Sequence, residues 1–327
     1  MFAEPATVLI TWPDYEPDGE ETGRRLIEAG HRLRLAPKRA RRSQDELIAL
    51  LAGARAAIVS TDPFDADVLE ASTELRVIAR VGVGTDSIDL EAASRHGISV
   101  CTTPRANTSS SADHTLALML AALRRVGEYD RAVRAGVWDR TGSATAWELT
   151  GSTVGIVGYG AIGQQVHRRL AGFGTRVVVC DPFVAAGMGI EPVELDELLA
   201  ISDVVSLHLP LTAATRGLLD RRRLALLRPH AVLINTARGA LVDEDALAQA
   251  LQQGKLRAAA LDVLAVEPPG ATRLTDLSNV VLTPHVAGLS TRSVHTMTRL
   301  ATDAVLAVLA GREPAGLVGL SLDRGGV

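Results

Sequence analysis

Residues 151–181 read GSTVGIVGYGAIGQQVHRRLAGFGTRVVVCD, and this stretch decides the fold class of the chain. An apolar run leads into a glycine-rich turn, a helical pattern follows, and a second apolar run ends at Asp181. Gly158 permits a tight strand-to-helix turn, Gly160 lets a pyrophosphate approach the backbone, and Gly163 lets helix and strand pack closely. The free N–H groups and the positive dipole end of the helix would meet the phosphates. The pattern therefore predicts a dinucleotide-binding unit.

Asp181 also indicates which dinucleotide is bound. A carboxylate at the end of the second strand accepts hydrogen bonds from ribose hydroxyls and repels a 2′-phosphate, which would prefer arginine. The next residues, Pro182 and Phe183, supply no cation. The sequence therefore favours NAD over NADP.

The composition of the 327-residue chain suits two α/β domains, with 47% hydrophobic and only 3% aromatic residues. A net charge of −4 gives no reason to expect a nucleic acid or a membrane surface as a partner. No apolar run approaches the roughly 20 residues of a membrane span. Cys101 and Cys180 read as buried thiols of a reducing compartment and predict neither a disulfide nor a metal site. We expect a cytoplasmic protein that holds no metal.

Short β-like runs alternate with helical stretches, which predicts parallel sheets with helices on both faces. We expect two Rossmann-like domains with an active-site cleft between them. A discontinuous substrate domain takes 1–103 plus 288–327, and an NAD-binding domain takes 104–287. The expected strands are 8–11, 33–36, 56–60, 77–81 and 99–103 in the first domain and 153–158, 176–181, 204–210, 231–237, 258–263 and 280–285 in the second; the expected helices of the first domain are 19–29, 43–51, 66–71, 90–95 and a returning helix at 291–310.

The boundary between the domains is expected just before a long helix over about 108–126. Pro104 disfavours helix immediately before it, and Asn107 or Thr108 can cap the helix that follows. The polar segment 127–149 then carries two tryptophans, which suggests an arm that docks on another surface such as a second subunit. By contrast, the basic cluster over 38–42 reads as a solvated surface loop.

Arg80 begins the stretch RVGVGTD, which follows the fourth strand. Two glycines straight after a strand leave N–H groups bare, which is a good place to hold a carboxylate with Arg80 as the counter-charge. Equally, the glycines could simply make a turn and Arg80 could pair with a structural acid. From the residues alone, both interpretations remain open.

Three polar side chains follow the fourth, fifth and sixth β-like runs of the second domain: Arg238, Glu267 and His285. Arginine offers a planar fork for a carboxylate or a polarised carbonyl, and histidine suits proton transfer near neutral pH. A carboxylate beside the histidine would stabilise its protonated ring. Each residue alone could instead be an ion pair, a turn cap or a strand-end histidine. Because all three follow strands of a sheet expected to bind NAD, we predict that they are catalytic.

The chain resembles the D-isomer-specific 2-hydroxyacid dehydrogenases, a family that includes phosphoglycerate, hydroxypyruvate and glyoxylate reductase types. The resemblance is clearest over 77–317 and rests on RVGVGTDSIDLEAASRHGI, GYGAIG, VVSLHLPLT, LINTARGALVDEDAL, ALDVLAVEPP and LTPHVAG. It implies a catalytic Arg, Glu and His trio at Arg238, Glu267 and His285, and a homodimer formed through the arm 108–149, chiefly its part 127–149. The implied NAD contacts are Val83, Thr108, Ala161, Ile162, Asp181, Thr236, Asp262 and Gly288, and the implied substrate-binding residues are Arg80, Val83, Gly84, Arg238 and His285.

Two departures from the family pattern stand out. The usual Ala-Glu-His before the long helix reads Ala112-Asp113-His114 here, a small change that should spare the hinge. Long phosphoglycerate dehydrogenases carry a C-terminal regulatory domain, whereas this chain ends at Val327. Feedback through such a domain is therefore not expected.

The activity expected is reversible reduction of a 2-keto acid to the D-2-hydroxy acid by NADH. Arg238 and the amides of 82–84 would hold the substrate, His285 would donate the proton, and Glu267 would keep the imidazole ring aligned. Arg80 and Arg105 could accept a second anionic group, such as a phosphate or a phosphonate. Two alternatives remain: a non-catalytic NAD(H)-sensing corepressor, and a dehydrogenase of the same fold that acts on formate or phosphite.

Overall fold

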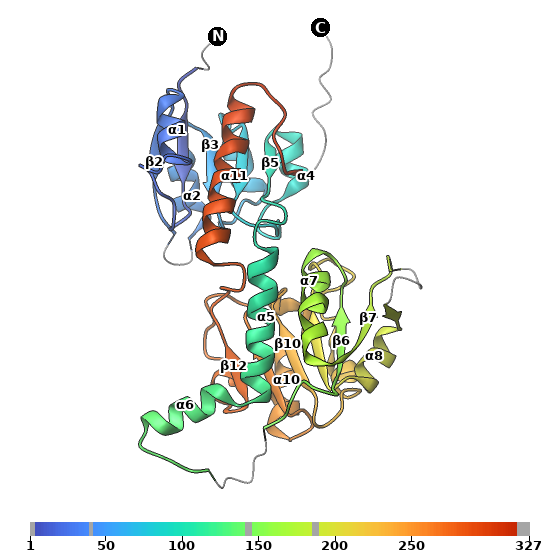
Figure 1. The fold of residues 1–327 in the computed structure, drawn as a ribbon. Helices are drawn as coiled ribbons and strands as arrows, with labels where there is room; N and C mark the ends of the chain where they lie inside the picture. The colour runs from blue at the N-terminus through green and yellow to red at the C-terminus, as the bar shows by residue number, and fades with distance from the viewer. Residues whose placement is uncertain (1–3, 39–41, 141–145, 185–189, 319–327) are drawn as a thin grey trace. The chain divides into compact units, whose positions relative to one another are not determined.

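The computed structural model describes residues 4–38, 42–140, 146–184 and 190–318 (Figure 1). Contacts divide the chain into two units, Met1–Asn107 with Ser290–Val327, and Thr108–Leu289. These boundaries lie a few residues beyond the expected ones, because helix α5 (Thr108–Leu123) belongs as a whole to the second unit. Each unit contains its own sheet flanked by helices, which confirms the expected α/β fold class.

The sheet of the first unit has the strand order β13-β5-β4-β3-β1-β2. Its neighbours pair in parallel except β13, which pairs antiparallel with β5. We expected a purely parallel sheet, and this sheet is not one. The chain returns from α11 and adds an antiparallel edge strand, a common arrangement in such folds. The elements are β1 Thr7–Ile10, α1 Gly23–Glu28, β2 Arg32–Leu35, α2 Gln44–Leu51, β3 Ala54–Val59, α3 Ala66–Ala71, β4 Val77–Arg80, α4 Leu90–Arg95, β5 Ser99–Cys101, α11 Thr291–Leu309 and β13 Leu317–Val318.

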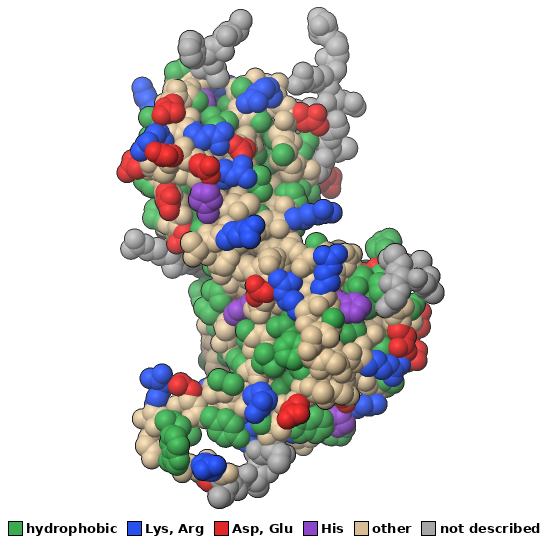
Figure 2. Space-filling view, in the orientation of Figure 1, with side chains coloured by type: hydrophobic (Ala, Val, Ile, Leu, Met, Phe, Trp, Pro, Cys, Tyr) green, Lys and Arg blue, Asp and Glu red, His purple; other side chains and the backbone are tan. Residues whose placement is uncertain are grey.

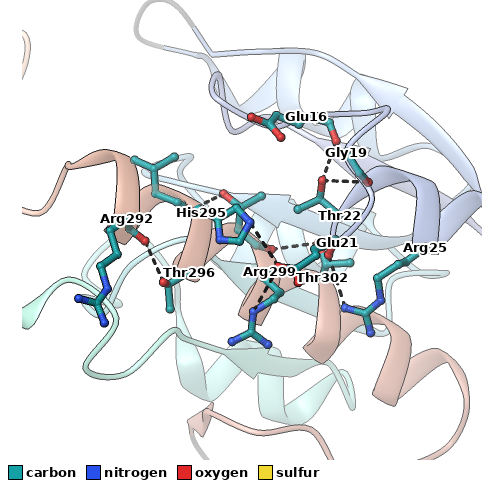
Figure 3. A network of polar contacts seen from close by, with 12 residues as sticks. Glu16, Gly19, Glu21, Thr22, Arg25, Arg292, His295, Thr296, Arg299 and Thr302 are labelled. Carbon is teal, nitrogen blue, oxygen red and sulfur yellow. Dashed lines mark hydrogen bonds and ion pairs between the residues drawn. The ribbon is translucent and has the colours of Figure 1, made fainter.

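Two apolar clusters form the core of this unit, one on each face of the sheet. Helices α2, α3 and α4 cover one face, and α1 and α11 cover the other. Figure 3 shows a polar network beside the contact of α1 with α11, in which His295 pairs with Glu21 at 3.3 Å. Arg25 also pairs with Asp303 of α11 at 2.7 Å. Partly exposed ion pairs contribute little. We therefore attribute the docking of α11 mainly to the burial of its apolar face, which includes Met297.

Helix α1 is shorter than the helix expected over 19–29 because a compact turn precedes it. Thr22 Oγ1 donates to the carbonyl oxygen of Glu16 at 2.8 Å, and Gly23 N donates to the same oxygen at 3.2 Å. A Cβ at Gly23 would lie 1.9 Å from the carbonyl oxygen of Pro17. The turn, part of which is drawn in Figure 3, thus fills the space that an earlier helical turn would need.

The basic cluster over 38–42 is anchored at both of its described ends, so its expected character as a solvated loop was wrong there. Arg42 pairs at 2.7 Å with Asp62, whose side chain is fully buried, and Thr11 donates to the same carboxylate at 2.5 Å. Lys38 Nζ donates to a backbone carbonyl at 2.7 Å. Residues 39–41 lie outside the described part of the chain.

The sheet of the second unit has the order β12-β11-β10-β9-β6-β7-β8, and all its neighbours pair in parallel. Strand β6 lies between β7 and β9, so the strand order reverses its direction at β6. In sheets of this kind, ligands bind at this switch point, beyond the carboxyl ends of the strands. The elements are α5 and α6 Val126–Arg134, β6 Thr153–Val157, α7 Ala161–Leu170, β7 Arg176–Cys180, β8 Glu191–Pro192, α8 Leu195–Ile201, β9 Val204–Leu207, α9 Arg221–Leu224, β10 Val232–Asn235, α10 Glu244–Gln252, β11 Ala258–Leu261 and β12 Val280–Leu282.

Helices α5 and α7 cover one face of this sheet, and α8, α9 and α10 cover the other. Figure 1 shows α5 running along the face above β10 and β12. The two-residue strand β8 was not expected, because its exposed residues form no apolar run.

The single helix expected over 108–126 is interrupted. Helix α5 ends at Leu123, Arg125 adopts a left-handed φ of 55°, and a separate helix α6 begins at Val126. The side chain of Arg125 donates to Glu128 in the first turn of α6, which stabilises the bend. The segment expected as a polar arm therefore begins as an amphipathic helix.

Candidate active site

The glycine turn after β6 has the geometry that a bound dinucleotide requires. Gly158 has a φ of 91°, and a Cβ there would lie 2.6 Å from the carbonyl oxygen of His208. At Gly163, a Cβ would lie 2.3 Å from the carbonyl oxygen of Gly158. At Gly160, which caps α7, no atom of the described residues beyond its own chain neighbours lies within 4 Å of the Cβ position. Two glycines thus permit close packing, and the third leaves the helix N-terminus at Ala161 and Ile162 accessible.

Asp181 directly follows β7 and is held in part by the glycine turn after β6. Its Oδ2 accepts a hydrogen bond from Tyr159 N at 2.7 Å, and its Oδ1 accepts one from Phe183 N at 2.8 Å. Each carboxylate oxygen has a further lone-pair direction. The residues present therefore fit an NAD ribose, and a 2′-phosphate here would meet a fixed negative charge.

The Arg238 loop follows β10 and is fixed from within. Asn235 is buried; its Nδ2 donates to the carbonyl oxygen of Arg238 at 2.8 Å, and its Oδ1 accepts from Ala237 N at 3.0 Å. The Arg238 guanidinium donates to the carbonyl oxygen of Ala237 at 2.7 Å. Sequence reasoning did not single out Asn235, although an asparagine that ends a buried strand immediately before a polar turn is a recognisable signal.

Gly239 brings the Arg238 loop against the loop that carries Glu267. A Cβ at Gly239 would lie 2.0 Å from the carbonyl carbon of Leu264 and 2.3 Å from Ala265 N. These are backbone atoms and cannot rotate away. The absence of a side chain at this position therefore sets the separation between the two loops.

Glu267 and His285 form a direct pair. His285 Nδ1 lies 2.6 Å from Glu267 Oε2, and Glu267 Oε1 accepts from Leu264 N at 3.1 Å. Burial alone would raise the pKa of Glu267, but the hydrogen bonds from His285 and Leu264 and the nearby charges of His285 and Arg238 outweigh it, so the pKa lies below its ordinary value. Glu267 is therefore ionised at neutral pH, and Nε2 is the ring nitrogen of His285 that remains for proton transfer.

The backbone of His285 is unusual and is held by Asp262. His285 has a φ of 56°, in the left-handed region that costs a non-glycine residue about 1–2 kcal/mol. Asp262 is fully buried, and its carboxylate accepts hydrogen bonds from Thr283 Oγ1 at 2.6 Å, Val286 N at 2.9 Å and Ala287 N at 2.8 Å. The loop 283–287 is thus wrapped around one buried carboxylate.

The other residues expected at the site lie in both units. In the second unit, Thr108 begins α5, Thr236 follows β10, and Gly288 ends the His285 loop. The remaining residues belong to the first unit: Arg80 ends its strand β4, and Val83 and Gly84 follow that strand.

The Arg80 loop is compact. Arg80 Nη1 donates to the carbonyl oxygen of Val81 at 2.5 Å, and a Cβ at Gly82 would lie 1.4 Å from that nitrogen. Thr103 Oγ1 accepts from Gly82 N at 2.9 Å. The guanidinium therefore covers Gly82, while Val83 remains 47% exposed.

Another histidine lies at this edge of the second sheet, immediately after β9. His208 Nε2 lies 2.8 Å from Ser206 Oγ. Burial lowers the pKa of His208 to about 4, so it is neutral at physiological pH.

Among the described residues, no group of His, Cys, Asp and Glu side chains could hold a metal ion. Within the same residues, the helices are too short or too polar to cross a membrane.

Comparison with known proteins shows the family of this chain. The family model described as D-isomer specific 2-hydroxyacid dehydrogenase, NAD binding domain, matches residues 116–287. The D-3-phosphoglycerate dehydrogenase of Mycobacterium leprae is 45% identical over 251 residues, 75% of this chain and 47% of the relative, so the chain spans about half the length of this relative. The glyoxylate reductase of Korarchaeum cryptofilum is 40% identical over 79% of this chain and 80% of the relative.

A solved structure of a protein from Thermus thermophilus matches with a TM-score of 0.88 and 40% identity, covering 95% of this chain and 99% of that one. The sequence matches and the fold match therefore indicate the same family. The chain belongs to the D-isomer specific 2-hydroxyacid dehydrogenase family.

Proposed function

We propose that the protein is an NAD-dependent oxidoreductase that reduces a 2-keto acid to the D-2-hydroxy acid and catalyses the reverse reaction. The observation that carries the proposal is the 2.6 Å pair of His285 and Glu267 at the carboxyl edge of an NAD-binding sheet, where the loop of Glu267 packs against the Arg238 loop. The names of relatives, phosphoglycerate dehydrogenase and glyoxylate reductase, support the same class of substrate.

The proposed division of work among the residues follows from their chemistry. The glycine turn, with Gly158, Gly160 and Gly163, and Asp181 would hold NAD, which supplies a hydride acceptor or donor when bound. Arg238 would hold the substrate's carboxylate or carbonyl through its planar fork. The resemblance to the family adds further contacts to the proposal. The proposed cofactor contacts are Val83, Thr108, Ala161, Ile162, Thr236, Asp262 and Gly288. The proposed contacts to the substrate carboxylate are Arg80, Val83 and Gly84.

Protonated His285 would donate its Nε2 proton to the developing alkoxide during reduction and accept it during oxidation. Glu267, ionised at neutral pH, would stabilise the imidazolium and fix its ring. Because the pKa of Glu267 lies below its ordinary value, the ionised carboxylate stabilises the imidazolium at every pH above the ordinary pKa of a carboxyl group. This stabilisation is lost only as the pH falls through the lower pKa that Glu267 has in the folded protein. Acidification within the neutral range should therefore leave the support of the His285 ring by Glu267 in place.

The test is a panel of 2-keto acids assayed with NADH and NADPH in parallel, for the wild type and His285→Ala. We expect turnover with NADH, and a loss of about 10²–10⁴-fold in kcat for the variant, since one general acid is removed. Comparison of glyoxylate or pyruvate with 3-phosphohydroxypyruvate decides whether Arg80 and Arg105 favour a second anionic group. Tight NADH binding without turnover of any keto acid would contradict the proposed activity.

We also propose a homodimer formed through the arm 108–149. Helix α6 buries none of its residues, and five large apolar side chains at helical spacing lie uncovered along it and the residues that follow (Figure 2). Such a stripe is unusual on a monomer and typical of an interface. These side chains are Val126, Tyr129, Val133, Val137 and Trp138.

The proposal also places the protein in the cytoplasm. Cys101 and Cys180 are both free thiols. Burial raises the pKa of Cys101 to about 12, so this thiol is not a reactive thiolate. Unpaired, unreactive cysteines are typical of a reducing compartment.

A further inference from the structure

Helix α5 carries a histidine that contacts the support of the His285 loop. His114 Nε2 lies 3.0 Å from Thr283 Oγ1 and 3.5 Å from Asp262 Oδ1. Thr283 Oγ1 donates its single proton to Asp262 at 2.6 Å. His114 must therefore donate from Nε2 to Thr283. The result is a directed relay from α5 through Thr283 to the buried carboxylate.

That carboxylate controls where His285 lies. Asp262 accepts the amides of Val286 and Ala287 on its two oxygens, and its own carbonyl oxygen accepts from His285 N at 2.7 Å. Left-handed backbone at a non-glycine residue persists only where its surroundings hold it. A rotation of the Asp262 carboxylate would release both amides and, with them, the loop that aims the His285 ring at Glu267.

The same helix touches the neighbouring loops at two further points. Ser110 Oγ donates to the carbonyl oxygen of Ala287 at 3.0 Å. Thr115 is fully buried, and its Oγ1 lies 2.9 Å from Thr236 Oγ1, two residues before Arg238. The first two turns of α5 therefore contact two of the loops that carry the proposed catalytic groups, those of Arg238 and His285.

We propose that His114 is a positioning residue for His285, acting through Thr283 and Asp262, and that α5 is the common support of the two catalytic loops. The inference rests on the proposed function insofar as it assigns a consequence for turnover. Its structural part, the hold on loop 283–287, stands independently of the reaction.

The experiment compares His114→Phe, which keeps a ring but removes the donor, with His114→Gln, whose amide restores an N–H at similar reach. For keto acid reduction we expect His114→Phe to lower kcat by about 10- to 100-fold, because a small misplacement of a catalytic group has this effect, with KM changed much less. His114→Gln should recover most of the loss. If His114 contributed only to the overall stability of the protein, His114→Gln would not restore kcat selectively.

A second readout needs no substrate. Hydrogen exchange of the Val286 and Ala287 amides should be faster in His114→Phe than in the wild type and close to wild type in His114→Gln. The matched control is His230→Phe, which removes another histidine–aspartate contact, 2.8 Å to Asp203, at the opposite edge of the same sheet. It should change neither kcat nor exchange in loop 283–287.

Unchanged exchange together with unchanged kcat in folded His114→Phe would overturn the proposal. If that variant does not fold, Thr283→Val and Thr283→Ser test the same relay from the loop side; Val should speed the exchange and Ser should not, and equal behaviour of the two would refute it. If the wild type reduces no 2-keto acid, the proposed function fails, and hydrogen exchange alone still decides whether His114 holds the loop.

Discussion

Gly239 is the residue at which a single added carbon would separate the Arg238 loop from the loop that carries Glu267. The space for its Cβ is occupied by the backbone of Leu264 and Ala265, the closest atom lying 2.0 Å away. Backbone atoms can yield only if the whole segment between β11 and Glu267 moves. The distance from Arg238 to the His285–Glu267 pair therefore depends on this one absent side chain.

We expect Gly239→Ala to lower the free energy of unfolding by about 1–3 kcal/mol, as overpacking does, and to lower kcat in addition. Chemical denaturation and steady-state kinetics measure the two effects. Gly172→Ala is the matched control, because no atom outside its own neighbourhood lies within 4 Å of the Cβ position there. A Gly239→Ala enzyme with native stability and native turnover would show that the loops adjust freely.

At the scale of elements, α6 differs from the other long helices because it contributes nothing to the core of its unit. Val133 is 51% exposed and Trp138 is 78% exposed, on a stripe that continues past the helix end. A helix whose apolar face stays in water gains little from tertiary packing, and short helices are marginal alone. A second copy of the chain would supply the missing contact.

We expect Val133→Glu to convert a dimer into a monomer, since it places a charge in the apolar stripe that the partner would cover. Light scattering coupled to size-exclusion chromatography reports the mass directly. Arg131→Glu, which introduces the same carboxylate on the opposite face of α6, should leave the mass unchanged. A wild-type protein that runs as a monomer at micromolar concentration would remove the dimer from the proposal.

At the scale of the whole molecule, two units with separate cores share one chain. The first unit is closed by a helix from the C-terminal segment, whereas the second is continuous in sequence and contains the glycine turn, Asp181 and the proposed catalytic trio. A ligand that binds only the folded state stabilises it by an amount that grows with the logarithm of the ligand concentration divided by its Kd. Cofactor binding should therefore be visible as a stability change of the second unit.

We expect NADH at about a hundredfold over its Kd to add about 2.7 kcal/mol to the stability of the second unit, and to raise its melting temperature. NADPH at the same concentration should give a smaller shift, because Asp181 meets the 2′-phosphate. Differential scanning calorimetry separates the two units if they melt independently. Asp181→Ser should narrow the gap between the two cofactors, and a larger shift with NADPH for the wild type would contradict the preference for NAD.

Local patterns in the sequence determined the course of both sheets. Apolar runs and the glycines of 158–163 act through backbone sterics over a few residues, so the longer strands, the nucleotide-binding turn and the helices of the first unit could be predicted to within a few positions. The exceptions had no local signal. The break at Arg125 depends on a contact with Glu128, and the short strand β8 exists only because it pairs with β7.

The sequence also placed Arg238, Glu267 and His285 after neighbouring strands, because the carboxyl ends of parallel strands share one edge. Only the tertiary structure decided what holds them there. Asp262 contacts residues 21 to 25 positions away, and His114 contacts Thr283 across 169 positions. Such contacts depend on how α5 lies on the sheet, and no spacing along the chain encodes them. The sequence thus determined which side chains follow the strands, whereas the packing of α5 on the sheet determined how these side chains are aligned.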